Sequence, residues 1–111
     1  LFTRLDELEA HLEGREWLVG DHKGILPEAD ICLFPTLVRF DLVYVFHFKC
    51  NLRRILDYPN LTSFLQRMLS VDGVRDPCDW NHIKSHYFWS HENINPYRSV
   101  PSGPLEGPQN Y

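Results

Sequence analysis

The stretch that decides the fold is Glu28–Asn51, EADICLFPTLVRFDLVYVFHFKCN, the longest apolar-dense segment of the chain. Its longest unbroken apolar run, Leu42–Phe46, is far shorter than the roughly 20 residues that a membrane-spanning helix needs, so we expect no membrane partner. A helix that is apolar on nearly every side belongs in the middle of a helical domain. We therefore predict a buried central helix that bends at Pro35, where proline removes an internal hydrogen bond.

Shorter amphipathic helices are expected on either side of this stretch. The first carries a leucine stripe at spacings of four, three and four residues, and Gly14 follows as a stop: Leu1, Leu5, Leu8 and Leu12. A second repeats apolar residues from Leu61 to Leu69, and a third begins at Cys78 or Asp79 and runs through Phe88. No segment has a convincing strand pattern. The predicted fold class is all-α, with a helical domain over residues 1–95 and an irregular, proline-containing tail over residues 96–111.

Composition narrows the class of protein further. The 111 residues are 43% hydrophobic and 14% aromatic, which is typical of one globular domain. The net charge of -4 and the absence of a basic block argue against nucleic acid as a partner. Three irregularly spaced cysteines argue against a disulfide framework and favour a reducing, cytoplasmic compartment, with an upstream organelle-targeting segment left open. The chain begins without Met and inside a helical pattern, so we expect a fragment.

Two tyrosines are candidates for binding chemistry. Tyr44 lies in the apolar half of the central stretch, and Tyr87 lies in the last expected helix beside Phe88. A buried phenol needs a hydrogen-bond partner, and in a pocket its hydroxyl can donate to a quinone or phenolate oxygen and stabilise negative charge. The alternative is that both are core tyrosines bonded to the backbone.

A metal site and a nucleophilic cysteine are weaker hypotheses. Residues at spacings of four would share a helical face and could present metal ligands, although this is not a standard zinc spacing: Cys78, His82 and His86, with His91 beyond them. Among the cysteines, Cys50 lies close to the cations of a small basic cluster, Lys49, Arg53 and Arg54. We expect Cys32 to pack in the core and expect nearby aspartates to oppose a Cys78 thiolate. The basic cluster is expected to be solvated or to pair with acidic residues.

Longer sequence blocks carry a family resemblance. The run WLVGDHKGILPEADICLFPTLVRFD, residues 17–41, resembles the helical C-terminal domain of glutathione transferases. The continuation RFDLVYVFHFKCNLRRILDYPNL, residues 39–61, followed by HIKSHYFWSHENINP, residues 82–96, and VPSGP, is similar to the glutathionyl-hydroquinone reductases, the xi class of transferases. The resemblance covers the chain from its start to about residue 104.

This resemblance implies a two-domain, homodimeric enzyme in which a thioredoxin-like domain precedes the helical one. Glutathione is the co-substrate and is bound mainly by that other domain, whose Cys-Pro-Trp motif supplies the nucleophile. None of the three cysteines here is followed by Pro-Trp, so no catalytic residue is expected in this chain. Tyr44 and Tyr87 match positions near the hydroquinone oxygen, whereas Phe88 stands where the family commonly has a further aromatic hydroxyl. The alternative is a non-catalytic, transferase-like module for protein interaction.

One departure from transferases lies at the start of the central helix. The family usually places Ser or Thr three residues before the aspartate that matches Asp30, and this chain has Pro27. Proline has neither a hydroxyl to cap the helix nor an N–H for the aspartate to bond. Leu26 and Ile31 are spaced for a hydrophobic staple if Pro27 is the N-cap, although Pro27 could instead be the first helical residue.

Overall fold

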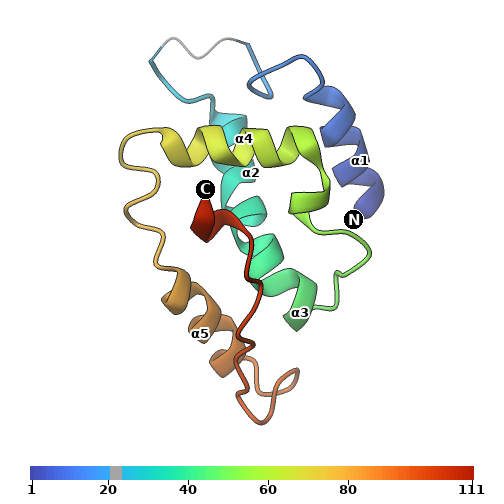
Figure 1. Ribbon diagram of the computed structural model, residues 1–111, viewed down its shortest axis with the longest axis vertical. Coiled ribbons are helices and arrows are strands. Elements are labelled where there is room, and N and C mark those ends of the chain that lie inside the picture. Colours follow the sequence, from blue (N-terminus) through green and yellow to red (C-terminus); the bar gives the residue numbers. More distant parts are fainter. Residues whose placement is uncertain (21–23) are drawn as a thin grey trace.

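The computed structural model describes residues 1–20 and 24–111, and within these ranges it contains helices and no strand (Figure 1). The dipeptide Gly20-Asp21 predicts a turn, which falls partly outside these ranges. The elements, in order, are α1 (Phe2–His11), α2 (Glu28–Arg39), the π-helical η1 (Phe40–Tyr44), α3 (Val45–His47), the 3-10 turn η2 (Ile55–Asp57), α4 (Pro59–Ser70), α5 (Trp80–Ser90) and the 3-10 turn η3 (Pro108–Asn110). The predicted all-α class is confirmed.

The central helix runs through α2, η1 and α3, so it ends at His47 rather than Asn51. Its burial is uneven. Cys32 in α2 is exposed, which corrects its expected place in the core, whereas Leu42 and Val43 in η1 are fully buried. Pro35 lies inside α2, and the departure from α-helical geometry is found further along, in η1. The bend expected at Pro35 therefore stays a prediction.

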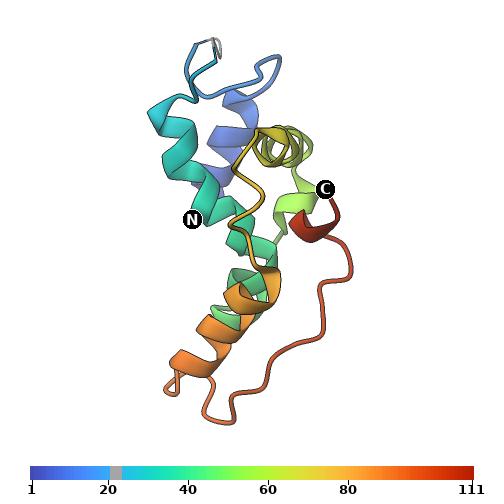
Figure 2. The ribbon, with the colours of Figure 1, turned by 90° about the vertical axis from the view of Figure 1, so that its left-hand side faces the viewer.

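The flanking helices cover the central one. α4 crosses α2, α1 lies against α4, and α5 lies beside η1 at the other end of the molecule (Figures 1 and 2). Their apolar stripes meet in one core, whose most buried members are Leu12, Leu37, Phe40, Ile55, Leu61, Phe64, Leu65 and Met68. The start of α4 follows from Pro59 at its first position, where a missing N–H removes no helical bond. The amphipathic patterns of α1 and α4 therefore predicted the faces that are buried, apart from Leu1, which is 62% exposed.

Two terminal features refine the expected layout. The short apolar run Trp17-Leu18-Val19 predicts a segment that packs against the helices. Trp17 and Leu18 do pack against the core, but Val19 is exposed. The tail is mostly irregular, yet it runs back along the molecule and ends beside α4 (Figures 1 and 2). There Tyr111 packs against the core, and Arg75 donates hydrogen bonds to the backbone carbonyls of Gln109 and Tyr111. The division of the chain near residue 95 stays a prediction, and the end of the tail contributes to the packing of the helices.

Pro27 leaves a visible defect where α2 begins. It is the N-cap residue, and α2 has no side-chain cap. Asp30 is fully buried, and its Oδ1 accepts a hydrogen bond from the Leu18 N–H at 3.0 Å. Its Oδ2 has no hydrogen-bond partner among the described residues. In a capping box the N-cap N–H would bond this side chain, and proline has no such group.

We predict that Pro27→Thr stabilises the domain by about 1 kcal/mol, because it supplies both a capping hydroxyl and an N–H for Asp30. The melting temperature should rise by roughly 3–5 °C in a differential scanning calorimetry experiment. Pro27→Ala is the matched control, because it restores the N–H without the hydroxyl and should give part of the gain. An unchanged or lower melting temperature for the threonine variant would show that proline suits this helix start.

Candidate functional site

The π-helical segment η1 positions the first candidate residue. Within it the Val45 N–H bonds the Phe40 carbonyl, five residues back instead of four. Such one-turn segments frequently occur at functional sites because the extra residue redirects the side chains that follow. Asp41, fully buried in η1, accepts hydrogen bonds from the backbone N–H groups of Ile55 at 2.6 Å and Leu56 at 3.1 Å. This carboxylate ties η1 to η2, so the segment that carries Tyr44 is anchored to the core.

Tyr44 and Tyr87, from η1 and α5, lie side by side. Their ring centroids are 6.2 Å apart and the rings are nearly perpendicular, at 73°. Phe40 on one side and Phe48 on the other also contact the Tyr44 ring, at centroid distances of 5.7 and 5.4 Å. Aromatic pairs prefer such edge-to-face arrangements at these separations. The two residues singled out from sequence are therefore brought together, although they are 43 positions apart in the chain.

The hydroxyl of Tyr44 is held in its protonated form. Burial is the main cause that raises its pKa above the ordinary tyrosine value, and hydrogen bonding with the Tyr87 side chain adds to this. The Arg39 guanidinium acts weakly in the opposite direction. A protonated phenol donates a hydrogen bond, so at neutral pH Tyr44 can support the Tyr87 side chain through the hydrogen bond between them.

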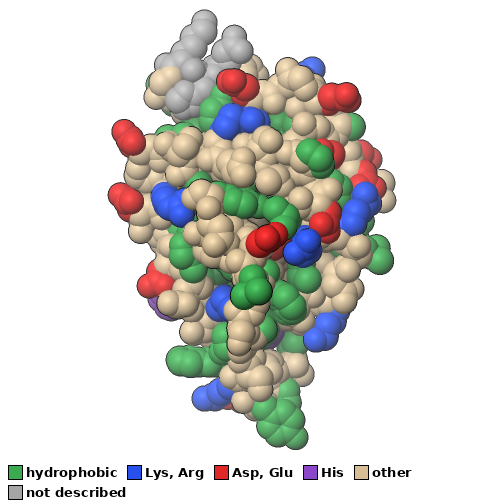
Figure 3. Space-filling view, in the orientation of Figure 1, with side chains coloured by type: hydrophobic (Ala, Val, Ile, Leu, Met, Phe, Trp, Pro, Cys, Tyr) green, Lys and Arg blue, Asp and Glu red, His purple; other side chains and the backbone are tan. Residues whose placement is uncertain are grey.

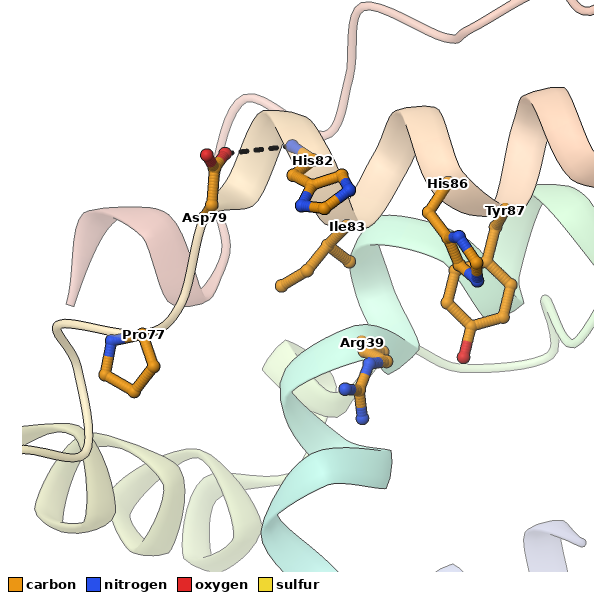
Figure 4. A pocket seen from close by; sticks show the side chains of 7 residues that line it. All are labelled: Arg39, Pro77, Asp79, His82, Ile83, His86 and Tyr87. Atoms are coloured by element: carbon orange, nitrogen blue, oxygen red, sulfur yellow. Dashed lines mark hydrogen bonds between the residues drawn. The ribbon is translucent and has the colours of Figure 1, made fainter.

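A pocket of about 260 Å³ opens beside this pair, between the end of α2 and α5. Its lining residues are Arg39, Pro77, Asp79, His82, Ile83, His86 and Tyr87 (Figure 4). The Tyr87 hydroxyl points from α5 into the space that the Arg39 side chain also reaches (Figure 4). Tyr44 is not itself a lining residue and supports the pocket through its contact with Tyr87. Sequence reasoning did not single out Arg39, because nothing in its neighbours predicts which side of the helix meets α5.

A histidine pair also escaped sequence reasoning. His47, at the end of α3, is only 3% exposed, and its Nε2 lies 2.8 Å from Nδ1 of His91, just after α5. The two rings are stacked, with centroids 5.0 Å apart. Burial, then the proximity of His91, then that of Lys49 lower the pKa of His47 below its ordinary value. The pair joins the ends of two helices and lies next to the Tyr44–Tyr87 cluster.

The depressed pKa of His47 predicts a pH dependence of stability. Because the folded protein resists protonation of this ring, the unfolded state binds more protons once the pH falls below the ordinary histidine value of 6.5. The free energy of unfolding should therefore fall as the pH is lowered from roughly pH 7 to pH 5, measured by urea titration. His47→Gln should remove that part of the slope, whereas the exposed His82, as His82→Gln, should keep it. Identical slopes in all three proteins would contradict the assignment.

The cysteines and the expected metal ligands are placed less favourably. Cys78 precedes α5, whose N-cap is Asp79, so it does not share a helical face with His82 and His86. No group of three or more potential ligands that could hold a metal ion occurs in the described ranges. Burial raises the pKa of the Cys78 thiol, which disfavours the reactive thiolate.

Two residues of the basic cluster pair with acidic side chains, which was one of the two environments expected for the cluster. Arg53 contacts Asp6 at 2.7 Å, and Arg54 contacts Asp57 at 3.2 Å. Both cations therefore have carboxylate partners, so neither is free to stabilise a Cys50 thiolate. On the face drawn in Figure 3, charged side chains of both signs are interspersed. None of the described helices is long and apolar enough to cross a membrane.

Comparison with known proteins places this arrangement in a family. Residues 1–67 match the glutathione S-transferase C-terminal domain. The chain belongs to this family. Over 106 residues, or 96% of the chain, it is 56% identical to the glutathionyl-hydroquinone reductase PcpF of Sphingobium chlorophenolicum and 45% identical to the reductase YqjG of Escherichia coli. It spans about a third of the length of these curated relatives, 33% and 31%.

Solved structures agree with the sequence relatives. The glutathione-bound structure of Escherichia coli YqjG superimposes with a TM-score of 0.89 at 44% identity, covering 96% of this chain and 34% of that one. The xi-class transferase of Phanerochaete chrysosporium gives 0.87 at 55% identity, covering 95% and 33%. The family and the helical transferase fold expected from the sequence are thus confirmed.

Proposed function

We propose that this chain is the substrate-binding helical domain of a glutathione-dependent reductase that releases hydroquinones from glutathionyl-hydroquinones. The observation that carries the proposal is the meeting of Tyr44 and Tyr87 beside a pocket, at a ring separation of 6.2 Å. The identity of 56% to a glutathionyl-hydroquinone reductase supports this substrate class. The co-substrate is glutathione, bound mainly by a thioredoxin-like domain outside this chain.

In the proposed reaction, a cysteine thiolate of that other domain attacks the sulfur of the glutathionyl-hydroquinone. The bond between this sulfur and the ring breaks, its electron pair passes to the ring, and the ring takes up a proton to give the free hydroquinone. The cysteine is left as a mixed disulfide with glutathione, and a second glutathione reduces it to give oxidised glutathione. Negative charge that collects on a ring oxygen is stabilised by a hydrogen bond from Tyr87, because a donor aimed at developing charge lowers the barrier. Tyr44 supports this donor through its side-chain hydrogen bond with Tyr87.

The proposal extends to assembly and compartment. We infer a homodimer in which this domain supplies much of the interface; a purely monomeric species in analytical ultracentrifugation of the full-length protein would contradict it. We also infer a reducing, cytoplasmic location, with which three free cysteines are consistent. A pool of full-length protein outside that compartment, seen by cell fractionation, would overturn this location.

The role of the tyrosines is tested in the full-length protein by Tyr44→Phe and Tyr87→Phe. Each should lower turnover of a glutathionyl-hydroquinone by about tenfold to a hundredfold, because Tyr87→Phe removes the donor to the ring oxygen and Tyr44→Phe removes the hydrogen bond that supports this donor. Tyr97→Phe is the control, since Tyr97 lies in the tail with 91% of its surface exposed. Turnover equal to wild type in both site variants would remove Tyr44 and Tyr87 from the site. A full-length protein without a Cys-Pro-Trp domain and without this turnover would favour the non-catalytic interaction module.

A further inference from the structure

The pocket beside α5 has one arginine in its lining, Arg39. Arg39 is a half-buried cation at the end of α2, and one of its Nη atoms donates a hydrogen bond to the Pro35 carbonyl at 2.8 Å. This bond holds the guanidinium in place without neutralising it. Within the described ranges, Arg4, Arg53, Arg54 and Arg98 form ion pairs with carboxylates. Arg39 forms none, and the same holds there for Arg15, Arg67 and Arg75; Arg39 differs from these three in lining the pocket.

Asp79 is the only acidic residue among those that line the pocket, and its side chain bonds the start of α5 instead of Arg39. Asp79 caps α5, where its Oδ1 accepts a hydrogen bond from the His82 N–H at 2.9 Å (Figure 4). It is exposed and directly precedes α5. The guanidinium of Arg39 therefore faces a hollow in which no carboxylate pairs with it. A half-buried charge without a partner is unfavourable, and an anionic ligand would relieve this.

The remaining lining groups define the shape of such a ligand. Ile83 and Pro77 offer apolar contacts, and Tyr87 offers a ring edge and a hydroxyl. His82 and His86 stand on the α5 side of the pocket and add further hydrogen-bonding capacity. A volume of about 260 Å³ accommodates a single substituted aromatic ring. One fixed cation beside these apolar and aromatic side chains is suited to a flat ring that carries a negative oxygen.

We propose that this pocket binds monocyclic aromatic anions, and that Arg39 selects the ionised oxygen of the ring. For the substrate this means a hydroquinone held as its phenolate, with Arg39 and Tyr87 on the same oxygen. The identity of the natural ligand rests on the proposed function, but the binding preference does not. Arg39 is therefore a specificity-determining residue, and hydroquinones with more acidic ring hydroxyls should bind more tightly.

The test measures binding alone, with para-nitrophenolate as the probe and para-nitroanisole as its uncharged counterpart. We expect wild type to bind the phenolate at least about tenfold more tightly, since a hydrogen bond to a charged group is typically worth one factor of ten or more. Arg39→Gln should abolish this preference and leave binding of the anisole unchanged. Arg4→Gln, an exposed arginine on α1, removes the same charge and should keep the preference.

The outcomes distinguish the proposed anion preference of the pocket from the proposed enzymatic function. Equal affinity of wild type for both probes, no binding of either, or an unchanged preference in Arg39→Gln would overturn the proposal. If Arg39→Gln does not fold, salt titration of wild type takes its place: phenolate binding should weaken with added salt while anisole binding stays constant, and parallel behaviour would overturn it. Loss of turnover in the tyrosine variants bears on the proposed function, whereas the preference for the phenolate bears only on this pocket.

Discussion

Replacing Asp41 by alanine should lower the free energy of unfolding by about 3 kcal/mol or more. The buried carboxylate accepts hydrogen bonds from the backbone N–H groups of Ile55 and Leu56, and truncating the side chain removes the acceptor of both. Each buried donor left without a partner costs about 1–3 kcal/mol. The measurement is urea unfolding followed by far-ultraviolet circular dichroism, which reports helix content.

Two further variants separate the hydrogen bonds from the charge. Asp41→Asn keeps one carbonyl oxygen for the close Ile55 N–H, so we expect an intermediate loss. Burial raises the pKa of Asp41 against the effect of its two backbone donors, so the charge itself adds little stability. Asp72→Ala removes an exposed carboxylate from the loop after α4 and should change the stability by less than about 0.5 kcal/mol. A loss for Asp41→Ala no larger than that of Asp72→Ala would show that η2 does not depend on this carboxylate.

The second large effect is expected at Phe40, where the core meets the candidate site. Its ring is fully buried, packs edge-on against Phe2 at 6.3 Å and contacts Tyr44 at 5.7 Å. Phe40→Ala removes this ring and leaves a cavity, which typically costs about 3–5 kcal/mol. The same change removes one wall of the Tyr44 ring. We therefore expect lower stability in urea unfolding and, in the full-length protein, lower turnover of a glutathionyl-hydroquinone.

Phe40→Leu serves as the conservative comparison, because it keeps most of the apolar volume and should lose only about 1–2 kcal/mol. Leu105→Ala is the surface control, since Leu105 is 88% exposed and its truncation leaves no cavity. If Phe40→Ala lost stability but retained full turnover, the packing of Tyr44 against Phe40 would matter for folding alone. A loss of stability no larger than that of Leu105→Ala would contradict the core position of the ring.

Several elements could be predicted because their signals are local. The leucine spacing of α1, the apolar repeat of α4 with Pro59 before it, and the capping residue Asp79 of α5 each lie within one helix. The candidate residues Tyr44 and Tyr87 came from local composition and from the family resemblance. Their contact could not be derived from the residues between them, because it depends on how α5 packs against η1.

The errors have the same origin. Cys32 lies in an apolar helix and was assigned to the core, but α2 turns that side chain to the surface. Val19 belongs to an apolar triplet, yet only its two neighbours reach the core. Hydrophobicity predicts that a segment is buried on average, whereas the exposure of one side chain depends on which face another element covers.

The sequence by itself determined the all-α class, the positions of the main helices and the transferase family. Helical periodicity, capping residues and family motifs all depend on residues that are close together in the chain. Only the tertiary structure decided the π-helical segment η1, the bond from Asp41 to η2, the His47–His91 pair and the pocket around Arg39. Each of these, apart from η1, joins groups that are at least 14 positions apart in the chain. Local sequence patterns carry no record of such contacts, which form only when the helices pack against one another.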